Sequence, residues 1–263
     1  MSGLKSEVLV SLLVDFVSMN RRWCQGLLKM FPSFFSWPDS SAYMNDRVEK
    51  ALARGPSRIL EVGGVDRPFL PKSSDYFYAG LDIEERPHCY EVYDSFLVQS
   101  VEQPVAGKYD LVLSKTLLEH VPDNQASFKA MCEGLDASGE MIHMIPMKGH
   151  PYALILRAVG PRMQKQLLHF LHPRNESVTG YPTFFNHCTA EEIRSLLEEN
   201  GMVEIDIRCF YMASDYFKFL MPLFVLVFCF EKICQKLEWK TFAALIVVSA
   251  RAPAEASSQS RST

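Results

Sequence analysis

The chain has 263 residues, of which 48% are hydrophobic and 22% are charged, and its formal net charge is −4 at pH 7. These values exclude global disorder and predict one large domain, or one domain with a substantial addition. The acidic balance argues against a nucleic-acid-binding surface. The seven cysteines are odd in number and include no C-x-x-C pair. This favours free thiols in the reducing cytoplasm over a disulfide framework or a zinc site.

An N-terminal helical extension, residues 1–53, is expected before the first strand. Residues 4–30 have the apolar spacing of a helix, and residues 4–37 interleave lysine and arginine with tryptophan and phenylalanine. Such interleaving is typical of a helix that lies in a membrane interface. The alternative is a helix packed on the domain. A second, short helix is expected over residues 44–53.

A glycine turn after the first strand organises the rest of the chain. The apolar run 59–62 ends at Gly63 and Gly64, and a second strand, residues 77–81, ends on Asp82 about twenty residues later. In a nucleotide-binding βαβ unit the glycine turn faces the cofactor, and an acid at the end of the next strand binds the ribose hydroxyls.

The remaining elements alternate in type along the chain. Strands are expected at residues 90–93, 109–114, 140–146, 203–211 and 241–250, and helices at 116–134 and 189–201. Thr189 caps the last helix and Glu192 completes a capping box. The alternation predicts a doubly wound, parallel α/β sheet within a domain of residues 54–250.

Two insertions exceed a minimal α/β repeat. Residues 148–188 form a long connection at the carboxyl edge of the sheet, where a substrate lid is expected. Residues 213–240 contain the apolar run 216–230, which as a helix reaches roughly 22 Å, short of the roughly 30 Å core of a bilayer. This run is interpreted as a membrane-dipping helix, a dimer contact or a buried core helix, with membrane or partner contact favoured. Residues 251–263 are expected to be a disordered tail.

Four stretches together resemble a known family. They are ILEVGG at 59–64, GLD at 80–82, YDLVLSKTLLEHVPD at 109–123 and GLDASGEMIHMIP at 134–146. In this order and spacing the chain, from about Arg58 to Met212, resembles the class I S-adenosylmethionine-dependent methyltransferases, in the type 11-like branch that includes the ubiquinone-biosynthesis methyltransferases. The resemblance implies a Rossmann-like, seven-stranded, mostly parallel sheet with an antiparallel last strand, and S-adenosylmethionine as cofactor.

The resemblance also implies a set of cofactor-binding residues. Glu61 and the backbone of Gly63 and Gly64 would hold the methionine end, Asp82 the ribose, Ile83 the adenine, Asp94 and Ser95 its exocyclic amine, and Ser114 and Lys115 the face where the substrate meets the methyl group. The chain departs from the family where a further glycine is replaced by Val65. Two prolines also follow, Pro68 and Pro71, so the first crossover helix must be short or missing.

The histidines supply candidates for a general base. His150, just past a strand end, and His187, before the cap at Thr189, are the two catalytic candidates. His143 alternates within a strand and is interpreted as a core or cofactor-adjacent histidine. Some quinone-directed members of the family bind a divalent cation with a glutamate and a histidine at the positions of Glu119 and His120, together with an acid three residues before the glutamate. Here that residue is Thr116, so no metal is predicted.

These observations predict an enzyme that transfers a methyl group to a small or lipid-linked acceptor, with a hydroxyl favoured. The expected location is cytoplasmic, or peripheral on the inner face of a membrane that residues 4–37 and 216–230 contact. The alternative function is a catalytically silent methyltransferase fold that serves as a membrane or protein interaction module. An NAD-dependent oxidoreductase is disfavoured by the absence of G-x-G-x-x-G. The oligomeric state is left open.

Overall fold

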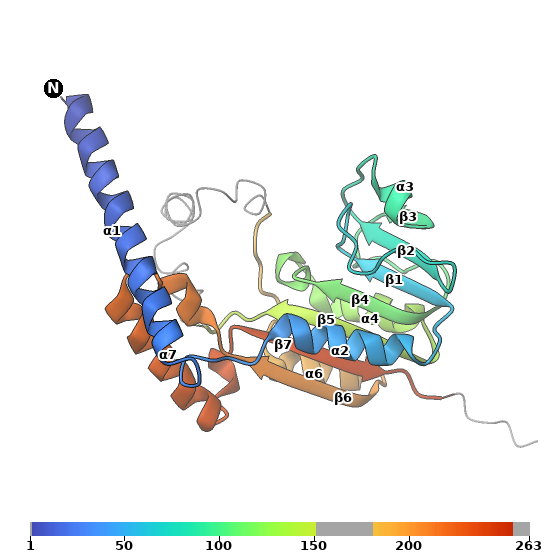
Figure 1. The fold of residues 1–263 in the computed structure, drawn as a ribbon. Coiled ribbons are helices and arrows are strands. Elements are labelled where there is room, and N and C mark those ends of the chain that lie inside the picture. Colours follow the sequence, from blue (N-terminus) through green and yellow to red (C-terminus); the bar gives the residue numbers. More distant parts are fainter. Residues whose placement is uncertain (1, 151–180, 255–263) are drawn as a thin grey trace, which may run out of the picture. The chain divides into compact units, whose positions relative to one another are not determined.

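The structure is a computed structural model that describes residues 2–150 and 181–254, and side chains from residue 11 onward. The chain divides into two compact units (Figure 1). The sheet unit comprises Asp39–Pro146, Pro182–Arg208 and Leu245–Thr263, and the helical unit comprises Met1–Pro38, Met147–Tyr181 and Cys209–Ala244. Most of the predicted lid, residues 151–180, and the end of the predicted tail, residues 255–263, lie outside the described residues.

The sheet unit is built on seven strands. They are β1 (Arg58–Val62), β2 (Phe77–Asp82), β3 (Ser95–Val98), β4 (Tyr109–Lys115), β5 (Leu135–Pro146), β6 (Val203–Phe210) and β7 (Leu245–Arg251). Their order across the sheet is β3-β2-β1-β4-β5-β7-β6. The pairs from β3 to β5 are parallel, whereas β7 runs antiparallel to β5. The predicted seven-stranded, mostly parallel sheet is therefore confirmed.

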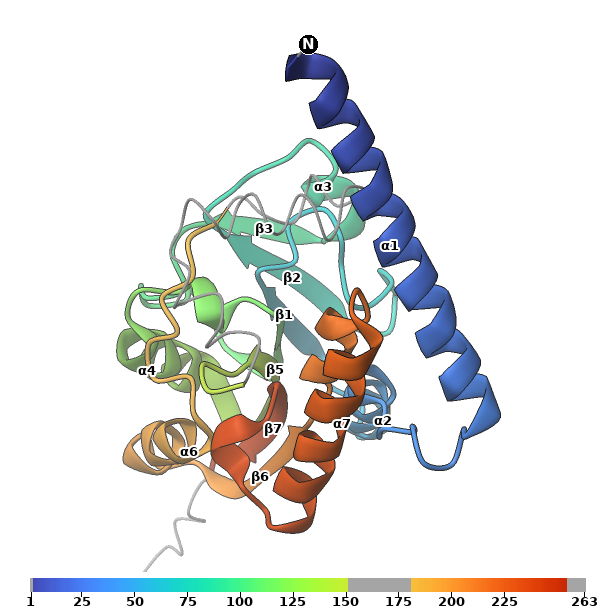
Figure 2. The same cartoon turned by 90° about the vertical axis from the view of Figure 1, so that its left-hand side faces the viewer.

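Helices cover both faces of this sheet. The longer ones are α2 (Ser40–Leu52) on one face, and α4 (Asn124–Gly134) and α6 (Ala190–Glu199) on the other (Figure 2). The predicted cap of α6 is present, since the Thr189 hydroxyl accepts a hydrogen bond from the Glu192 N–H at 3.2 Å. The central strands are almost completely buried, which is why their sequences are largely apolar runs rather than alternating patterns.

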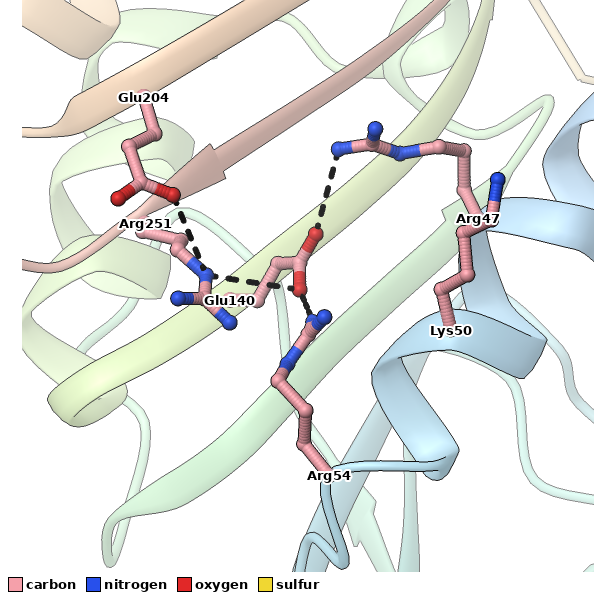
Figure 3. A pocket seen from close by; sticks show the side chains of 6 residues that line it. All are labelled: Arg47, Lys50, Arg54, Glu140, Glu204 and Arg251. Carbon is pink, nitrogen blue, oxygen red and sulfur yellow. Dashed lines mark ion pairs between the residues drawn. The ribbon is translucent and has the colours of Figure 1, made fainter.

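Ion pairs around one buried carboxylate attach α2 to the sheet. Glu140 of β5 pairs with Arg47 at 3.6 Å, with Arg251 at 3.9 Å, and with Arg54 (Figure 3). These residues line a pocket of about 390 Å³, together with Lys50 and Glu204. Because Glu140 lies in the amino-terminal half of β5, the pocket is remote from the carboxyl edge of the parallel strands. We interpret it as part of the docking of α2.

Two expected elements were wrong in type or extent. Residues 90–93 were expected to be a strand, but Cys89–Val92 form a short helix, α3, and the strand follows at Ser95–Val98. The expected helix 116–134 begins only at Asn124, after a 3₁₀ turn at Leu118–His120. Pro122 accounts for the late start, because a proline disfavours helical geometry in the residue before it, and Val121 is indeed extended.

The connection between β1 and β2 has no helix. Residues 63–76, all of which are described, contain turns and irregular backbone only. The prediction of a short or missing first crossover helix is confirmed. Two parallel strands are thus joined without the helix that usually covers such a crossover.

The helical unit pairs the two apolar segments of the sequence. Helix α1 (Ser2–Met30) packs against α7 (Met221–Lys236). Phe35, which follows α1, lies with its ring centroid 4.7 Å from that of Phe228 and 5.8 Å from that of Phe224. Part of the run 216–230 is therefore a buried core helix, one of the three predicted alternatives. None of the described helices is both long and apolar enough to cross a bilayer.

Candidate functional site

The carboxyl edge of the parallel strands brings the glycine turn beside the acid. Val62 pairs with Leu81 on one side and with Ser114 on the other, so β1, β2 and β4 end together. The Gly63 N–H donates to the Leu81 carbonyl at 2.8 Å, and Gly63 has φ +86°, a conformation that favours glycine. Gly63 and Asp82 therefore lie next to each other, as the sequence predicts for a nucleotide site.

Both glycines of the turn are also required by the packing of the protein itself. A Cβ at Gly63 would lie 2.9–3.1 Å from side-chain atoms of Leu117. A Cβ at Gly64 would lie 2.7 Å from the carboxyl carbon of Glu61 and would clash with the Tyr93 hydroxyl. The turn thus folds tightly over side chains of the sheet unit.

Glu61 is the centre of a buried hydrogen-bond network. Its carboxylate accepts from the Tyr78 hydroxyl, from the Tyr93 hydroxyl at 3.0 Å, and from the Phe69 N–H at 2.9 Å. Burial raises the pKa of Glu61, and burial together with the Glu61 charge raises the pKa of both tyrosines. The network holds the irregular β1–β2 connection in place, a role that sequence reasoning missed. The expectation that Glu61 holds the methionine end stays a prediction.

Asp82 ends β2 in a half-buried position. Its carboxylate accepts from the Glu84 N–H at 2.9 Å, and burial raises its pKa. The next side chain, Ile83, is 65% exposed, which offers an apolar surface beside the carboxylate. Arg86 pairs with Glu84 at 2.8 Å and with Asp66 of the glycine turn at 3.2 Å, so it links the loops that follow β1 and β2.

Asp94 and Ser95 lie at the wrong end of their strand for the role assigned to them. That assignment rested on a strand ending at Asp94, whereas β3 begins at Ser95, which pairs with Ala79. Asp94 accepts from the Tyr78 N–H at 2.9 Å, which lowers its pKa. The carboxyl end of β3 is Val98, paired with Asp82.

The residues that follow β3 at the site edge are Gln99 and Ser100. The Gln99 N–H donates to the Asp82 carbonyl at 3.0 Å, which seats this turn directly beside the predicted ribose-binding acid. Sequence reasoning missed both residues. The apolar run Phe96-Leu97-Val98 was the signal that could have located the strand.

At the end of β4, two neighbouring residues have different environments. The Ser114 hydroxyl is buried and lies 2.7 Å from Nδ1 of His143. Burial lowers the pKa of His143 to about 3, so this histidine is neutral, and its prediction as a core residue is confirmed. Lys115 is exposed, with its ammonium 5.8 Å from the centroid of the Phe69 ring. Of the two, Lys115 is the one accessible at the edge.

Glu119 is a buried acid next to the site edge. Burial raises its pKa to about 8, so the carboxyl group is protonated at neutral pH. Its backbone carbonyl accepts from the N–H groups of Phe184 and Phe185 at 2.8 and 3.1 Å, which attaches the aromatic stretch to this turn. In the described part of the chain, no three histidine, cysteine or acidic residues are grouped as metal ligands would be.

The two catalytic candidates lie in different units. His187 belongs to the sheet unit and has φ +48°, in the loop before α6. His150 belongs to the helical unit, where its ring centroid lies 6.4 Å from that of Tyr216. Burial lowers the pKa of His150 to about 4. Their catalytic roles stay predictions.

The described groups fit the chemistry of S-adenosylmethionine. The Asp82 carboxylate suits a ribose diol, and the exposed Ile83 side chain suits the flat face of an adenine. The left-handed turn at Gly63 places backbone at the strand ends, where such folds bind ligands.

Comparison with known proteins agrees with this geometry. A family model described as a methyltransferase domain matches residues 19–205. A search of curated proteins found no match. A solved S-adenosylmethionine-dependent methyltransferase from Archaeoglobus fulgidus shares 14% identity, with 86% of this chain and 99% of that chain covered and a TM-score of 0.50.

Two other solved structures are similar at lower scores. N-methyltransferase NodS from Bradyrhizobium japonicum, in complex with S-adenosylhomocysteine, shares 12% identity over 81% of this chain and 86% of that chain, with a TM-score of 0.46. Phosphoethanolamine N-methyltransferase 2 from Haemonchus contortus, in complex with S-adenosylmethionine, shares 12% identity over 79% of this chain, with a TM-score of 0.46. The chain spans about half of that enzyme, 52% of its length. Since the methyltransferase model matches more than half of the chain, and the sheet has the same fold, the chain belongs to the methyltransferase family of S-adenosylmethionine-dependent enzymes.

Proposed function

We propose that the protein transfers a methyl group from S-adenosylmethionine to a hydroxyl of a small or lipid-linked acceptor. The observation that carries this proposal is the pairing of the Gly63 turn with Asp82 at the carboxyl edge of the sheet. When bound, the cofactor supplies an electrophilic methyl group for in-line displacement. The protein therefore acts mainly by binding, orienting and excluding water.

We assign a role to each residue at the carboxyl edge of the sheet from its position there. Asp82 accepts hydrogen bonds from the ribose, and Ile83 packs on the adenine. Gln99 and Ser100 replace Asp94 and Ser95 as the groups beside the adenine, because they follow β3 at the edge. The backbone of Gly63 and Gly64 faces the methionine end of the cofactor, and Glu61 stabilises that turn. Ser114 is a buried residue that stabilises β4, and Lys115 lines the acceptor side.

Methylation of a hydroxyl benefits from a base that removes its proton. His187 is our first candidate, since it lies in the same unit as the cofactor edge. His150 is the second candidate; with its pKa lowered to about 4 it is neutral at pH 7 and is a weaker base than an ordinary histidine.

Of the two kinds of acceptor, a lipid-linked one is supported by the apolar character of residues 4–37 and 216–230. We propose that these residues make a peripheral contact with the inner face of a membrane. Membership in the branch that includes the ubiquinone-biosynthesis methyltransferases is proposed on the same ground, because those acceptors are amphiphilic.

A second candidate function is a catalytically silent methyltransferase fold. Three features favour it: Val65 stands at φ +49° where the family has glycine, the crossover helix is missing, and the Glu61 carboxylate already has three donors from the protein. Binding of the cofactor separates the two functions.

The test is isothermal titration of S-adenosylmethionine and S-adenosylhomocysteine into the full chain, with Asp82→Ala and the matched control Asp75→Ala. Asp75 is exposed, just before β2, at the strand end away from the edge. We expect binding that Asp82→Ala weakens about 10- to 100-fold, because hydrogen bonds to a charged group contribute about 1.5–3 kcal/mol. Asp75→Ala should bind as the natural chain does. No binding by a folded natural chain would refute the enzyme and leave the silent fold.

A further inference from the structure

We propose that the helical unit docks on an anionic lipid bilayer through one exposed stripe of α1. The stripe consists of Leu12, Phe16, Trp23 and Met30, which are 43–68% exposed. This inference deepens the lipid-linked acceptor of the proposed function and rests on it for its biological purpose. Binding of the bilayer itself requires no methyl transfer.

The stripe is a property of the helical repeat. Its members are separated by four, seven and seven residues, and at about 100° per residue they fall within about 40° of one another around the helix. Large apolar side chains rarely line up in this way on a helix surface that faces water. Phe31 and Phe34 continue the exposed apolar surface beyond the end of α1.

The neighbouring side of α1 is already occupied by α7. Val17, Asn20 and Cys24 are buried. The Asn20 side-chain oxygen accepts from the Met221 N–H at 2.9 Å, and the Cys24 thiol contacts the Lys218 carbonyl at 3.7 Å. These contacts fix the rotation of the helix, so the stripe cannot turn inward to be covered by α7.

The opposite side of the stripe carries cations. Arg22 and Lys29 are exposed and lie about 100° and about 120° around the helix from Trp23. An apolar stripe bordered by cations is the arrangement of a helix that lies in the plane of an anionic interface. α1 extends about 43 Å over its 29 residues, yet none of the described helices meets the requirements of a membrane span, so it lies on the bilayer rather than across it.

The charges of the two units favour an anionic bilayer, rather than a second copy of the chain, as the partner of the stripe. Histidines are not counted as charged here. The described side chains of the helical unit include eight lysines and arginines and four acids, whereas those of the sheet unit include 13 lysines and arginines and 24 acids. An anionic bilayer therefore attracts the helical unit and repels the sheet unit. A second copy seated on the stripe would instead bring two cationic units together.

The experiment is flotation of the full chain with vesicles of phosphatidylcholine alone and of phosphatidylcholine containing about one-third phosphatidylserine. The stripe variant is Phe16→Ser with Trp23→Ser, and its matched control is Val203→Ser, an exposed apolar residue of the sheet unit. The charge variant is Arg22→Glu with Lys29→Glu, and its matched control is Lys129→Glu in the exposed part of α4. All substituted side chains are exposed or half-exposed, so the fold should persist, which circular dichroism verifies.

We expect the natural chain to bind the phosphatidylserine vesicles. The stripe variant should bind them at least tenfold more weakly and the charge variant about tenfold more weakly, whereas both controls should bind as the natural chain does. Added salt should weaken binding of the natural chain. Equal binding by the stripe variant, or no binding by a folded natural chain, would overturn the proposal. The proposal would also be overturned if light scattering showed that the natural chain is a dimer and that the stripe variant alone is a monomer. Titration of S-adenosylmethionine into the same variants separates this failure from failure of the methyltransferase proposal.

Discussion

Replacement of Gly64 by alanine should destabilise the sheet unit through overlap of the new Cβ with two identified side chains. Gly64 is not among the glycines with positive φ, so its backbone accepts alanine and the cost arises from contacts. The added Cβ would meet the Tyr93 hydroxyl and the Glu61 carboxyl group, both of which are held in a buried network. Overpacking of a core site costs about 1–3 kcal/mol, and we expect about 2 kcal/mol here.

The cause can be tested with a second substitution. Tyr93→Phe removes the hydroxyl that the new Cβ would meet, and costs about 1–2 kcal/mol on its own because a buried carboxylate loses one donor. In the double variant the contact with the Tyr93 hydroxyl, which is the closest one, is removed, whereas the contact with Glu61 stays. The loss of stability of the double variant should therefore be at least about 1 kcal/mol smaller than the sum of the single losses.

Urea unfolding followed by far-ultraviolet circular dichroism, which reports the backbone of both units, measures these free energies. The three tryptophans, residues 23, 37 and 239, all belong to the helical unit, so their fluorescence identifies the part of the transition that comes from that unit. Gly26→Ala is the matched control, because a Cβ there meets open space, and it should leave stability unchanged or raise it by up to about 1 kcal/mol. Losses that add within about 0.5 kcal/mol would refute the reasoning.

Two further predictions concern a buried acid and a buried ring. The folded chain holds the Glu119 proton up to about pH 8, whereas the unfolded chain releases it near the ordinary value of 4.5. The free energy of unfolding should therefore fall as pH rises through this window, and Glu119 should contribute up to about 1.4 kcal/mol per pH unit. Glu119→Gln should make the slope shallower by this contribution, and identical slopes in urea titrations of the two proteins would contradict the prediction. Phe228→Ala should destabilise the helical unit by about 3–5 kcal/mol, because the ring is fully buried among aromatic neighbours. Tryptophan fluorescence should show this loss, while Leu226→Ala, at a side chain 66% exposed, should cost less than about 0.5 kcal/mol; equal losses would contradict the packing described.

The sheet could be predicted because its signals are local. Buried parallel strands are continuous apolar runs, and those at Ile59–Val62 and Tyr109–Ser114 stand between glycines, prolines and charged residues. The edge strand was misplaced because Tyr90–Tyr93 also has strand-forming residues, and only the register with β2 decides between it and Ser95–Val98. That single error moved two of the nine predicted cofactor residues to the far end of a strand.

The network around Glu61 could not be predicted for a different reason. Its partners are Phe69, Tyr78 and Tyr93, which are 8, 17 and 32 residues away, and hydrogen bonds over such separations leave no periodic pattern. The Gly63–Asp82 pair was predictable because the strands on either side fix the distance between turn and acid. The pairing of α1 with α7 was likewise hidden, since each segment alone also suited a membrane.

The division of the helical unit over three separate segments has a consequence for synthesis. α1 leaves the ribosome well before its packing partner α7, which begins only at Met221, some 190 residues after α1 ends. At about 5–20 residues per second, the buried side of α1 stays uncovered for roughly 10–40 s. During that interval Val17, Cys24 and the exposed stripe are equally open to solvent, chaperone or bilayer. The nascent chain therefore carries the uncovered apolar side of α1 until α7 has been translated and the helical unit is complete.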